Sequence, residues 1–326
     1  MSAARAERVG RVGYLVLDRP AALNALERDT IERLAAGLAA HAADPAVELV
    51  VIRSDDARAF CAGGDMKRAR ELVLADRHAE LEDFFAAEYA LNLAIARLEK
   101  PYVALLDGVA MGGGLGLSVH GSHRVTTERA RLAMPETRIG FFPDVGATHF
   151  LTRLPRGVGR WLGTSGASVD GAEAVSVGLA THHVRAEALP ALRARLEREG
   201  TAALGAALEA AAAGAATPEP ALPARFARRA EWFSGTTREA IDATLARAAA
   251  AGADDAEAQR RALDALSPHA VDLTLSLLDG DASRPLEAAL AREREAGREA
   301  IRHPDFVEGI RAVLVDRDPP RWAPRG

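Results

Sequence analysis

The chain has 326 residues, 48% hydrophobic and 27% charged, which is the composition of a globular protein long enough for a main domain and a smaller one. Its formal net charge of −5 and the lack of any Lys/Arg run argue against nucleic acid as a partner. A single cysteine excludes a disulfide framework, and no apolar run reaches the roughly 18 residues that a membrane-spanning helix needs.

The first part of the chain alternates predicted strands and helices. Residues 11–18 and 47–53 are rich in Val and Leu and predict strands; residues 30–43 between them carry apolar side chains at helical spacing, with Thr30 placed as the cap. The apolar run 102–106 follows a proline and predicts a buried strand. This alternation indicates an α/β core. Because a strand begins almost at the first residue, we also expect no signal or transit peptide and a cytoplasmic location.

From Ala186 onward the chain is rich in Ala, Arg and Glu at the spacing of amphipathic helices. A strand is suggested there only over residues 312–315. The small-residue run 210–216, followed by two prolines, predicts a helix end and a loop. We therefore expect an α/β core over residues 1–200 and a helical region over residues 201–326.

Two glycine clusters and an acidic segment indicate acyl chemistry. Residues 111–116 read MGGGLG, and residues 134–144 read MPETRIGFFPD. In acyl chemistry, a carbonyl that becomes tetrahedral needs N–H donors for its oxyanion. It also needs a carboxylate that attacks the carbonyl or deprotonates a group beside it. A helix that starts after Gly113 presents such N–H groups at its N-terminus. The second cluster, AFCAGGDM at 59–66, offers another N–H at Gly64.

The glycines have other interpretations. A dinucleotide fingerprint G-x-G-x-x-G that starts at Gly112 or Gly114 ends on an apolar residue instead of glycine. A nucleophile elbow G-x-S-x-G centred on Ser118 fails at His120, so Ser118 is expected to pack in a helix. A tight turn or close helix–strand packing accounts for the glycine spacing as well as an oxyanion hole does.

The motifs AFCAGGD, MGGG and MPE resemble those of the crotonase (enoyl-CoA hydratase/isomerase) superfamily. Within it, the chain looks most like the hydrolases of 3-hydroxyisobutyryl-CoA. This likeness rests on five segments, 84–89, 100–105, 112–121, 134–144 and 305–316. The resemblance implies a crotonase-like spiral of ββα units with a C-terminal helical region.

The resemblance also implies the residues that act. The oxyanion N–H groups fall on Gly64 and Gly113, the catalytic glutamate on Glu136, and two further substrate-contacting carboxylates on Asp144 and Glu88. Glu136 would attack the thioester or activate water to do so, and Asp144 would hold the substrate's 3-hydroxyl or assist the water. Glu88 would shape the acyl pocket, and Gly113, Glu136 and Asp144 would also bind substrate.

The chain departs from the hydratase pattern at two positions. Hydratases carry a glutamate two residues after the third glycine of the cluster, where this chain has Gly116. They commonly carry a small residue after the Phe-Pro pair, where this chain has Asp144. Addition of water across a double bond thereby loses one of its two cooperating carboxylates, which favours thioester hydrolysis.

Glu88 is a candidate functional residue independently of the family resemblance, because it lies in the apolar stripe of a predicted helix. A buried ion pair with an arginine is the structural alternative to a substrate role, since an unpaired buried carboxylate costs several kcal/mol. If Glu88, Glu136 and Asp144 share one pocket, their repulsion keeps at least one of them protonated near neutral pH. The stripe is formed by Leu81, Phe84, Leu91, Ile95 and Leu98.

We therefore predict an acyl-CoA thioester hydrolase that converts 3-hydroxyisobutyryl-CoA to 3-hydroxyisobutyrate and CoA, as in valine catabolism. The alternatives are a hydratase or isomerase on the same fold, since an isomerase needs only one base, and a non-catalytic acyl-CoA-binding protein. No metal or other cofactor is expected, because coenzyme A arrives with the substrate. Cys61 is expected to be a packed apolar residue. A homo-oligomer is compatible with the resemblance, which leaves the number of subunits open.

Overall fold

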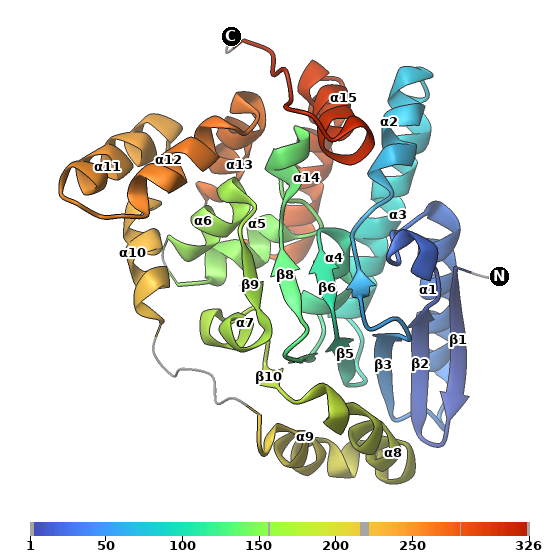
Figure 1. Cartoon of the computed structure of the whole chain (residues 1–326). Helices are drawn as coiled ribbons and strands as arrows, with labels where there is room; N and C mark the ends of the chain where they lie inside the picture. Colours follow the sequence, from blue (N-terminus) through green and yellow to red (C-terminus); the bar gives the residue numbers. More distant parts are fainter. Residues whose placement is uncertain (1–2, 156, 216–221, 281, 325–326) are drawn as a thin grey trace. The chain divides into compact units, whose positions relative to one another are not determined.

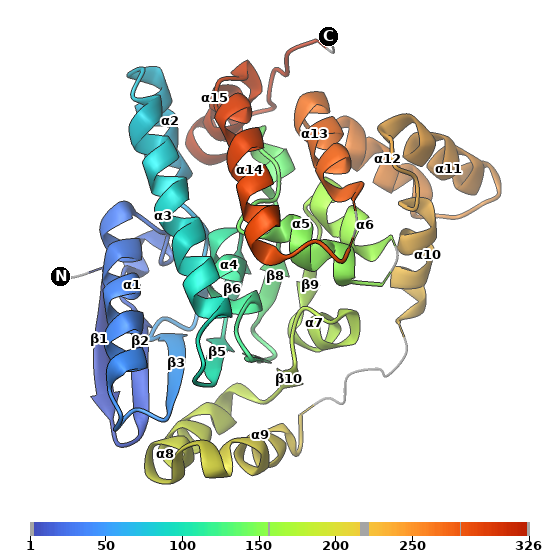
Figure 2. The ribbon, with the colours of Figure 1, turned by 180° about the vertical axis from the view of Figure 1, so that it is seen from behind.

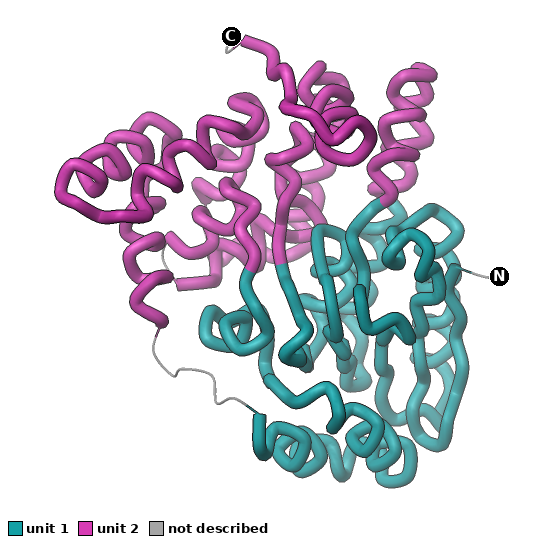
Figure 3. Tube along the Cα trace, viewed as in Figure 1, with its two compact units in different colours: residues 1–64, 87–132, 169–221 teal, residues 65–86, 133–168, 222–326 magenta. Residues whose placement is uncertain are grey.

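The computed structural model describes residues 3–155, 157–215, 222–280 and 282–324. The chain divides into two compact units, each made of three segments (Figure 3). Unit 1 comprises residues 1–64, 87–132 and 169–221, and unit 2 comprises residues 65–86, 133–168 and 222–326. The division falls inside three elements, α3 (His78–Ala96), β8 (Arg131–Ala133) and β9 (Ser168–Asp170).

These units differ from the expected ranges 1–200 and 201–326. Two segments of the expected core, 65–86 and 133–168, group with the C-terminal helices. The expected ranges rested on the change in composition along the chain. A compact unit, however, consists of the segments that pack against one another, wherever they lie in the sequence. The sequence pattern shows the change in composition and not this packing.

Unit 1 is built on a six-stranded sheet with the strand order β1-β2-β3-β5-β7-β10 (Figure 1). The first pair is antiparallel, and the others are parallel. The predicted strands at 11–18, 47–53 and 102–106 are confirmed as β2, β3 and β5. The bounds are β1 (Ala4–Val9), β2 (Val12–Leu17), β3 (Leu49–Ser54), β5 (Tyr102–Leu106), β7 (His123–Thr126) and β10 (His182–His183).

Both faces of this sheet are covered, which explains why all six residues of β2 are buried. Tyr14 and its alternate neighbours on β2 join an apolar cluster with α8 (Leu189–Glu199) and α9 (Leu204–Ala212). The opposite face meets α1 (Arg28–Ala43), because a Cβ built on Gly13 would lie 2.5 Å from Cγ of His41. Figure 2 shows α1 lying over β1 and β2.

A second, four-stranded sheet has the order β4-β6-β8-β9. Its first two strands, β4 (Ala59–Cys61) and β6 (Val109–Met111), are parallel. Each of these strands runs directly into one of the two glycine clusters, and α4 (Gly113–Val119) follows the second cluster. Since the carboxyl ends of parallel strands meet at one edge of a sheet, this pairing brings the two clusters together. Helix α7 (Gly171–Val177) completes the regular helices of unit 1.

Unit 2 is mainly helical. The ring of Trp161 on α6 lies 5.4 Å from that of Phe226 on α10. The 3₁₀ turn η2 (Glu136–Ile139) lies against α15, because a Cβ on Gly140 would meet the carbonyl oxygen of Asp305 at 2.1 Å. The helices are α2 (Met66–Leu74), α5 (Ala147–Phe150), α6 (Val158–Ser165), α10 (Ala224–Trp232), α11 (Arg238–Ala250), α12 (Ala256–Asp264), α13 (Pro268–Leu278), α14 (Leu286–Ala300) and α15 (Pro304–Ile310).

Two local predictions were wrong. Thr30 lies inside α1 and is buried, and the helix begins two residues earlier, after Glu27. The strand suggested at 312–315 is the π-helical turn η6 (Arg311–Asp316), which continues from α15. Its apolar residues are too few to distinguish a strand from a helical turn by periodicity. The predicted helix end is confirmed at Ala212, the last residue of α9, but residues 216–221 lie outside the described part of the chain.

In the described ranges, each helix is too short or too polar to cross a membrane.

We expect Gly13→Ala to destabilise unit 1. The added Cβ would lie 2.5 Å from Cγ of His41, whose Nε2 is hydrogen-bonded to the carbonyl oxygen of Tyr14 at 3.1 Å. Overpacking of this kind costs about 1–3 kcal/mol of unfolding free energy, measurable by urea denaturation. Gly205→Ala is the matched control: it adds the same methyl group on α9 with nothing within 4 Å, and should stabilise by about 0.5–1 kcal/mol. Equal effects of the two substitutions would contradict the packing described for β2.

Candidate active site

Two glycine-containing loops of unit 1 meet beyond the ends of β4 and β6. A Cβ on Gly63, whose φ is +98°, would lie 3.6 Å from the backbone nitrogen of Gly113. The next residue, Gly64, forms a parallel bridge with Leu26, and the N–H of Leu26 donates to the carbonyl of Gly63 at 2.8 Å. The residues predicted for an oxyanion hole, Gly64 and Gly113, therefore lie on neighbouring loops.

The helix predicted after Gly113 is confirmed as α4, which begins at Gly113 itself. Its N-cap Gly112 has φ +48° and ψ −119°, a conformation that glycine adopts readily. The N–H groups of Leu115 and Gly116 donate to the carbonyl of Gly112 at 2.8 and 3.2 Å. Helix geometry gives the earlier N–H of Gly113 no acceptor within α4, so it is suited to an oxyanion.

Glu88 lies beside Gly113. Its side chain is on α3 and 2% exposed, which confirms the burial predicted from the apolar stripe. A Cβ on Gly113 would lie 2.2 Å from Oε1 of Glu88 and 2.9 Å from Cδ1 of Leu26. Any residue larger than glycine at position 113 would displace the glutamate. Unit 1 thus brings together three of the predicted residues, Gly64, Glu88 and Gly113.

The other two predicted residues, Glu136 and Asp144, belong to unit 2. Both are buried, with exposures of 7% and 5%. Glu136 opens η2, where its carbonyl accepts from the N–H of Phe141 at 3.0 Å. The same turn is fixed by Thr137, whose hydroxyl donates to the carbonyl of Thr164 at 3.0 Å. Glu136 therefore sits on a short segment anchored by both backbone and side-chain hydrogen bonds.

Asp144 precedes a strained turn. Val145 is fully buried and has φ +52°, and Gly146 follows with φ +85°. Positive φ is uncommon for a β-branched residue and costs on the order of 1–3 kcal/mol. The N–H of Ala147 donates to the carbonyl of Asp144 at 2.8 Å and closes the turn. Strain of this kind persists only where surrounding contacts hold it.

Glu293 was missed in the sequence analysis, and its hydrogen bonds hold the strained turn after Asp144. It lies on α14 and is fully buried. Its Oε2 accepts from the N–H of Gly146 at 2.7 Å, and its Oε1 accepts from the N–H and hydroxyl of Thr148 at 2.8 and 2.6 Å. Burial raises the pKa of Glu293 to about 8, against the effect of these hydrogen bonds and with a contribution from the charge of Asp144.

A signal for Glu293 exists in the sequence. The carboxylate occupies a buried stripe at helical spacing, as Glu88 does. The Ala-, Arg- and Glu-rich composition around it hides the stripe. Its other members are Leu286, Ala289, Leu290, Gly297 and Ala300. Asn92, one turn after Glu88 on α3, is also fully buried and was not singled out from the sequence.

Two structural interpretations made from the sequence are confirmed. Ser118 is fully buried in α4 and donates to the carbonyls of Gly114 and Leu115 at 3.1 and 3.0 Å. Cys61 is fully buried, and burial raises the pKa of its thiol to about 12, which disfavours the reactive thiolate and fits a packed apolar residue. Within the described ranges, no group of three or more His, Cys, Asp or Glu side chains is arranged to hold a metal ion.

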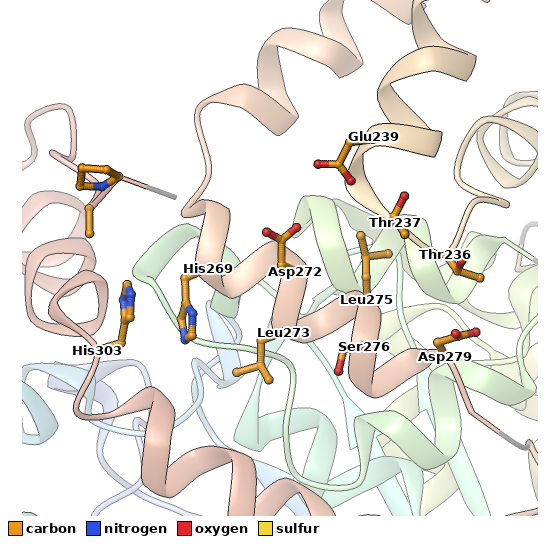
Figure 4. A pocket seen from close by; sticks show the side chains of 12 residues that line it. Thr236, Thr237, Glu239, His269, Asp272, Leu273, Leu275, Ser276, Asp279 and His303 are labelled. Carbon is orange, nitrogen blue, oxygen red and sulfur yellow. The ribbon is translucent and has the colours of Figure 1, made fainter. Parts of the chain in front are cut away.

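A separate open pocket of about 930 Å³ lies in unit 2 (Figure 4). It is lined by residues of α11, α13 and the C-terminal tail, among them Glu239 and Asp272. The imidazoles of His269 and His303 stack there with ring centroids 3.8 Å apart. None of the five predicted site residues lines it. This pocket is therefore separate from the residues that the sequence motifs predict for the active site.

Comparisons with known proteins identify the family. A family model described as enoyl-CoA hydratase/isomerase matches residues 12–326. The chain is 38% identical to "3-hydroxyisobutyryl-CoA hydrolase, mitochondrial" of Mus musculus, over 98% of this chain and 83% of that protein. It is also 38% identical to "3-hydroxyisobutyryl-CoA hydrolase 1" of Arabidopsis thaliana, over 98% and 86%. The mouse name refers to mitochondria, so the cytoplasmic location expected for this chain stays a prediction.

Solved structures agree on the fold. An enoyl-CoA hydratase from Rhodobacter sphaeroides superposes with a TM-score of 0.89 at 39% identity, covering 99% of this chain and 93% of that one. A carnitinyl-CoA dehydratase from Mycobacterium thermoresistibile gives 0.88 at 34%, covering 99% and 92%. Sequence, motifs and architecture lead to one conclusion: the chain has the crotonase fold and belongs to the enoyl-CoA hydratase/isomerase family.

Proposed function

We propose that the chain is an acyl-CoA thioester hydrolase that converts 3-hydroxyisobutyryl-CoA to 3-hydroxyisobutyrate and CoA, a step of valine catabolism. The observation that carries the proposal is the position of the acidic groups. Gly116 lies in α4 where hydratases have a glutamate, while Glu136 and Asp144 are buried carboxylates on anchored segments. The names of the mouse and Arabidopsis relatives support the same activity and substrate.

In the proposed reaction, the N–H groups of Gly64 and Gly113 donate to the thioester oxygen as it becomes negative. A carboxylate oxygen of Glu136 forms a bond to the carbonyl carbon, the C–S bond breaks, and the CoA thiolate leaves and takes up a proton. Water then hydrolyses the resulting mixed anhydride and restores Glu136. In the second route, Glu136 instead takes a proton from a water molecule that attacks the carbonyl directly.

Asp144 is proposed to accept a hydrogen bond from the substrate's 3-hydroxyl. A buried carboxylate makes a stronger hydrogen bond than an exposed one, because water does not compete for it. This role would give the enzyme a preference for 3-hydroxyacyl thioesters.

An enoyl-CoA isomerase is the second candidate, because it needs a single base and Glu136 could serve. The solved structures at 34% and 39% identity, named as a dehydratase and a hydratase, keep double-bond chemistry in consideration. A non-catalytic acyl-CoA-binding protein is less favoured, since it has no need of several buried carboxylates.

We expect thiol release from 3-hydroxyisobutyryl-CoA to exceed hydration of crotonyl-CoA by about a hundredfold or more. The reason is that Gly116 leaves hydration short of one acid–base group, which is worth on the order of 10²–10⁴ in rate. Free thiol and ultraviolet absorbance, followed on the same enzyme preparation, measure the two reactions. Comparable rates would refute the hydrolase assignment, and double-bond migration without thiol release would establish the isomerase instead.

Glu136→Gln should abolish turnover and leave CoA-ester binding nearly intact. The substitution removes a nucleophile or base while keeping the size of the side chain. Single-turnover thiol release and equilibrium binding of a non-hydrolysable acyl-CoA analogue test the two statements separately. Thr137→Val, at the next residue of η2, tests the anchoring of the turn separately, because it removes the hydroxyl that donates to the carbonyl of Thr164 and leaves the Glu136 carboxylate in place. Undiminished turnover in the glutamine variant would exclude Glu136 from the chemistry.

Asp144→Ala should lower kcat/KM for 3-hydroxyisobutyryl-CoA. The corresponding loss of transition-state stabilisation should be roughly 1.5–3 kcal/mol, the scale of a hydrogen bond to a charged group. For isobutyryl-CoA, which lacks the hydroxyl, the loss should be clearly smaller. Steady-state kinetics on the two esters give the comparison, and thermal denaturation checks that the fold is unchanged. Equal losses on both esters would assign Asp144 to water activation, and no loss on either would leave it as a turn residue.

A further inference from the structure

Helix α5 has no cap of its own. Its N-cap residue is Gly146, which has no side chain to accept from the first N–H groups of the helix. Glu293 of α14 takes this role: its Oε2 accepts from the N–H of the N-cap Gly146 at 2.7 Å, and its Oε1 accepts from the N–H of Thr148, the second residue of α5, at 2.8 Å. A residue far along the chain thus supplies what Ser, Asp or Asn supplies at an ordinary helix start.

The cap holds the turn that carries Asp144. The two backbone N–H groups bound by Glu293 are two and four residues after Asp144, and the N–H between them, that of Ala147, donates to the carbonyl of Asp144. Between Asp144 and Gly146 lies Val145, with its positive φ of +52°. Without the cap, the strained Val145 would favour rearrangement of the turn.

Ordinary packing gives no reason for a carboxylate at this point of α14. The side chain is fully buried, and its two oxygens accept hydrogen bonds from the backbone N–H of Gly146 and from the backbone N–H and hydroxyl of Thr148. A buried carboxyl group costs several kcal/mol unless it is hydrogen-bonded. Here both oxygens are used as acceptors, which an amide or a hydroxyl group at this position could not reproduce.

We propose that Glu293 is a positioning residue for Asp144. By capping α5 it fixes the backbone of residues 144–148 and thereby holds the Asp144 carboxylate at the position from which it binds the 3-hydroxyl of the substrate. The proposal rests on the function proposed above, because it assigns Glu293 to substrate selection through Asp144.

The kinetic test uses Glu293→Gln, which keeps size but leaves one of the bound N–H groups facing an amide NH₂. We expect kcat/KM for 3-hydroxyisobutyryl-CoA to fall roughly 10- to 100-fold, and that for isobutyryl-CoA clearly less. In an Asp144→Ala background, Glu293→Gln should cause little further loss, because the two residues act as one unit. Equal losses on both esters, or losses that multiply in the double variant, would overturn the proposal.

Two controls separate positioning from stability. Glu295→Gln changes an exposed glutamate of the same helix, which pairs with Arg298, and should leave both activities unchanged. Leu290→Ala removes buried apolar volume from α14 without touching the cap, so it should lower Tm but leave the ratio of the two activities unchanged. A ratio that changes as much in Leu290→Ala as in Glu293→Gln would mean that Glu293 has only a structural role.

A second measurement does not depend on the substrate. Hydrogen exchange of the Gly146 and Thr148 amides should quicken about tenfold or more in Glu293→Gln, because each loses or weakens its acceptor. Should that variant fail to fold, Glu293→Asp, which keeps the carboxyl group but shortens its reach, takes its place. If the native enzyme releases no thiol, the proposed function fails while this exchange still tests the cap. Unchanged exchange in a folded variant would refute the cap itself.

Discussion

The organisation of unit 1 depends on the close packing of neighbouring segments around Gly113 and Gly114. Any side chain at these two positions would prevent it. A Cβ on Gly114 would lie 2.6 Å from the carbonyl oxygen of Cys61, and one on Gly113 would lie 2.2 Å from Oε1 of Glu88. The glycines therefore let the end of β4, the start of α4 and the α3 carboxylate pack together. Backbone donors held in this way need no reorganisation when charge develops on a bound carbonyl, which is the main advantage of an oxyanion hole.

Buried carboxylates are the second constraint, and they oppose stability. Glu88, Glu136, Asp144 and Glu293 are each at most 7% exposed, although an uncompensated buried charge costs several kcal/mol. For Glu293 the compensation is visible in three hydrogen bonds, and the residue in turn holds the strained turn after Asp144. At Glu293 the cost of burial is thus offset in its immediate surroundings, where the hydrogen bonds also hold a strained turn.

The family membership by itself does not decide the reaction. Structures named as a hydratase and a dehydratase share the fold at 39% and 34% identity, while sequence relatives of similar identity are named as hydrolases. One architecture can host different reactions, because the reaction depends on the residues of the site and not on the fold alone. In this chain the α4 position is Gly116, and an acidic group stands at Asp144, in a loop of the other unit.

The sequence by itself determined the elements with strong local patterns: three buried strands, the helix that follows the MGGG cluster, and the burial of Glu88 in an apolar stripe. Its motifs also indicated the family and the five candidate residues, whose roles stay predictions. The edge strand β1 was missed because most of its residues are at least partly exposed and show no apolar pattern. Tertiary structure alone decided the grouping of residues 65–86 and 133–168 with the C-terminal helices, and the cap on α5. Glu293 and Gly146 are 147 residues apart in the chain, and periodicity reports only on neighbours within a few turns, so their pairing arises only when the chain folds.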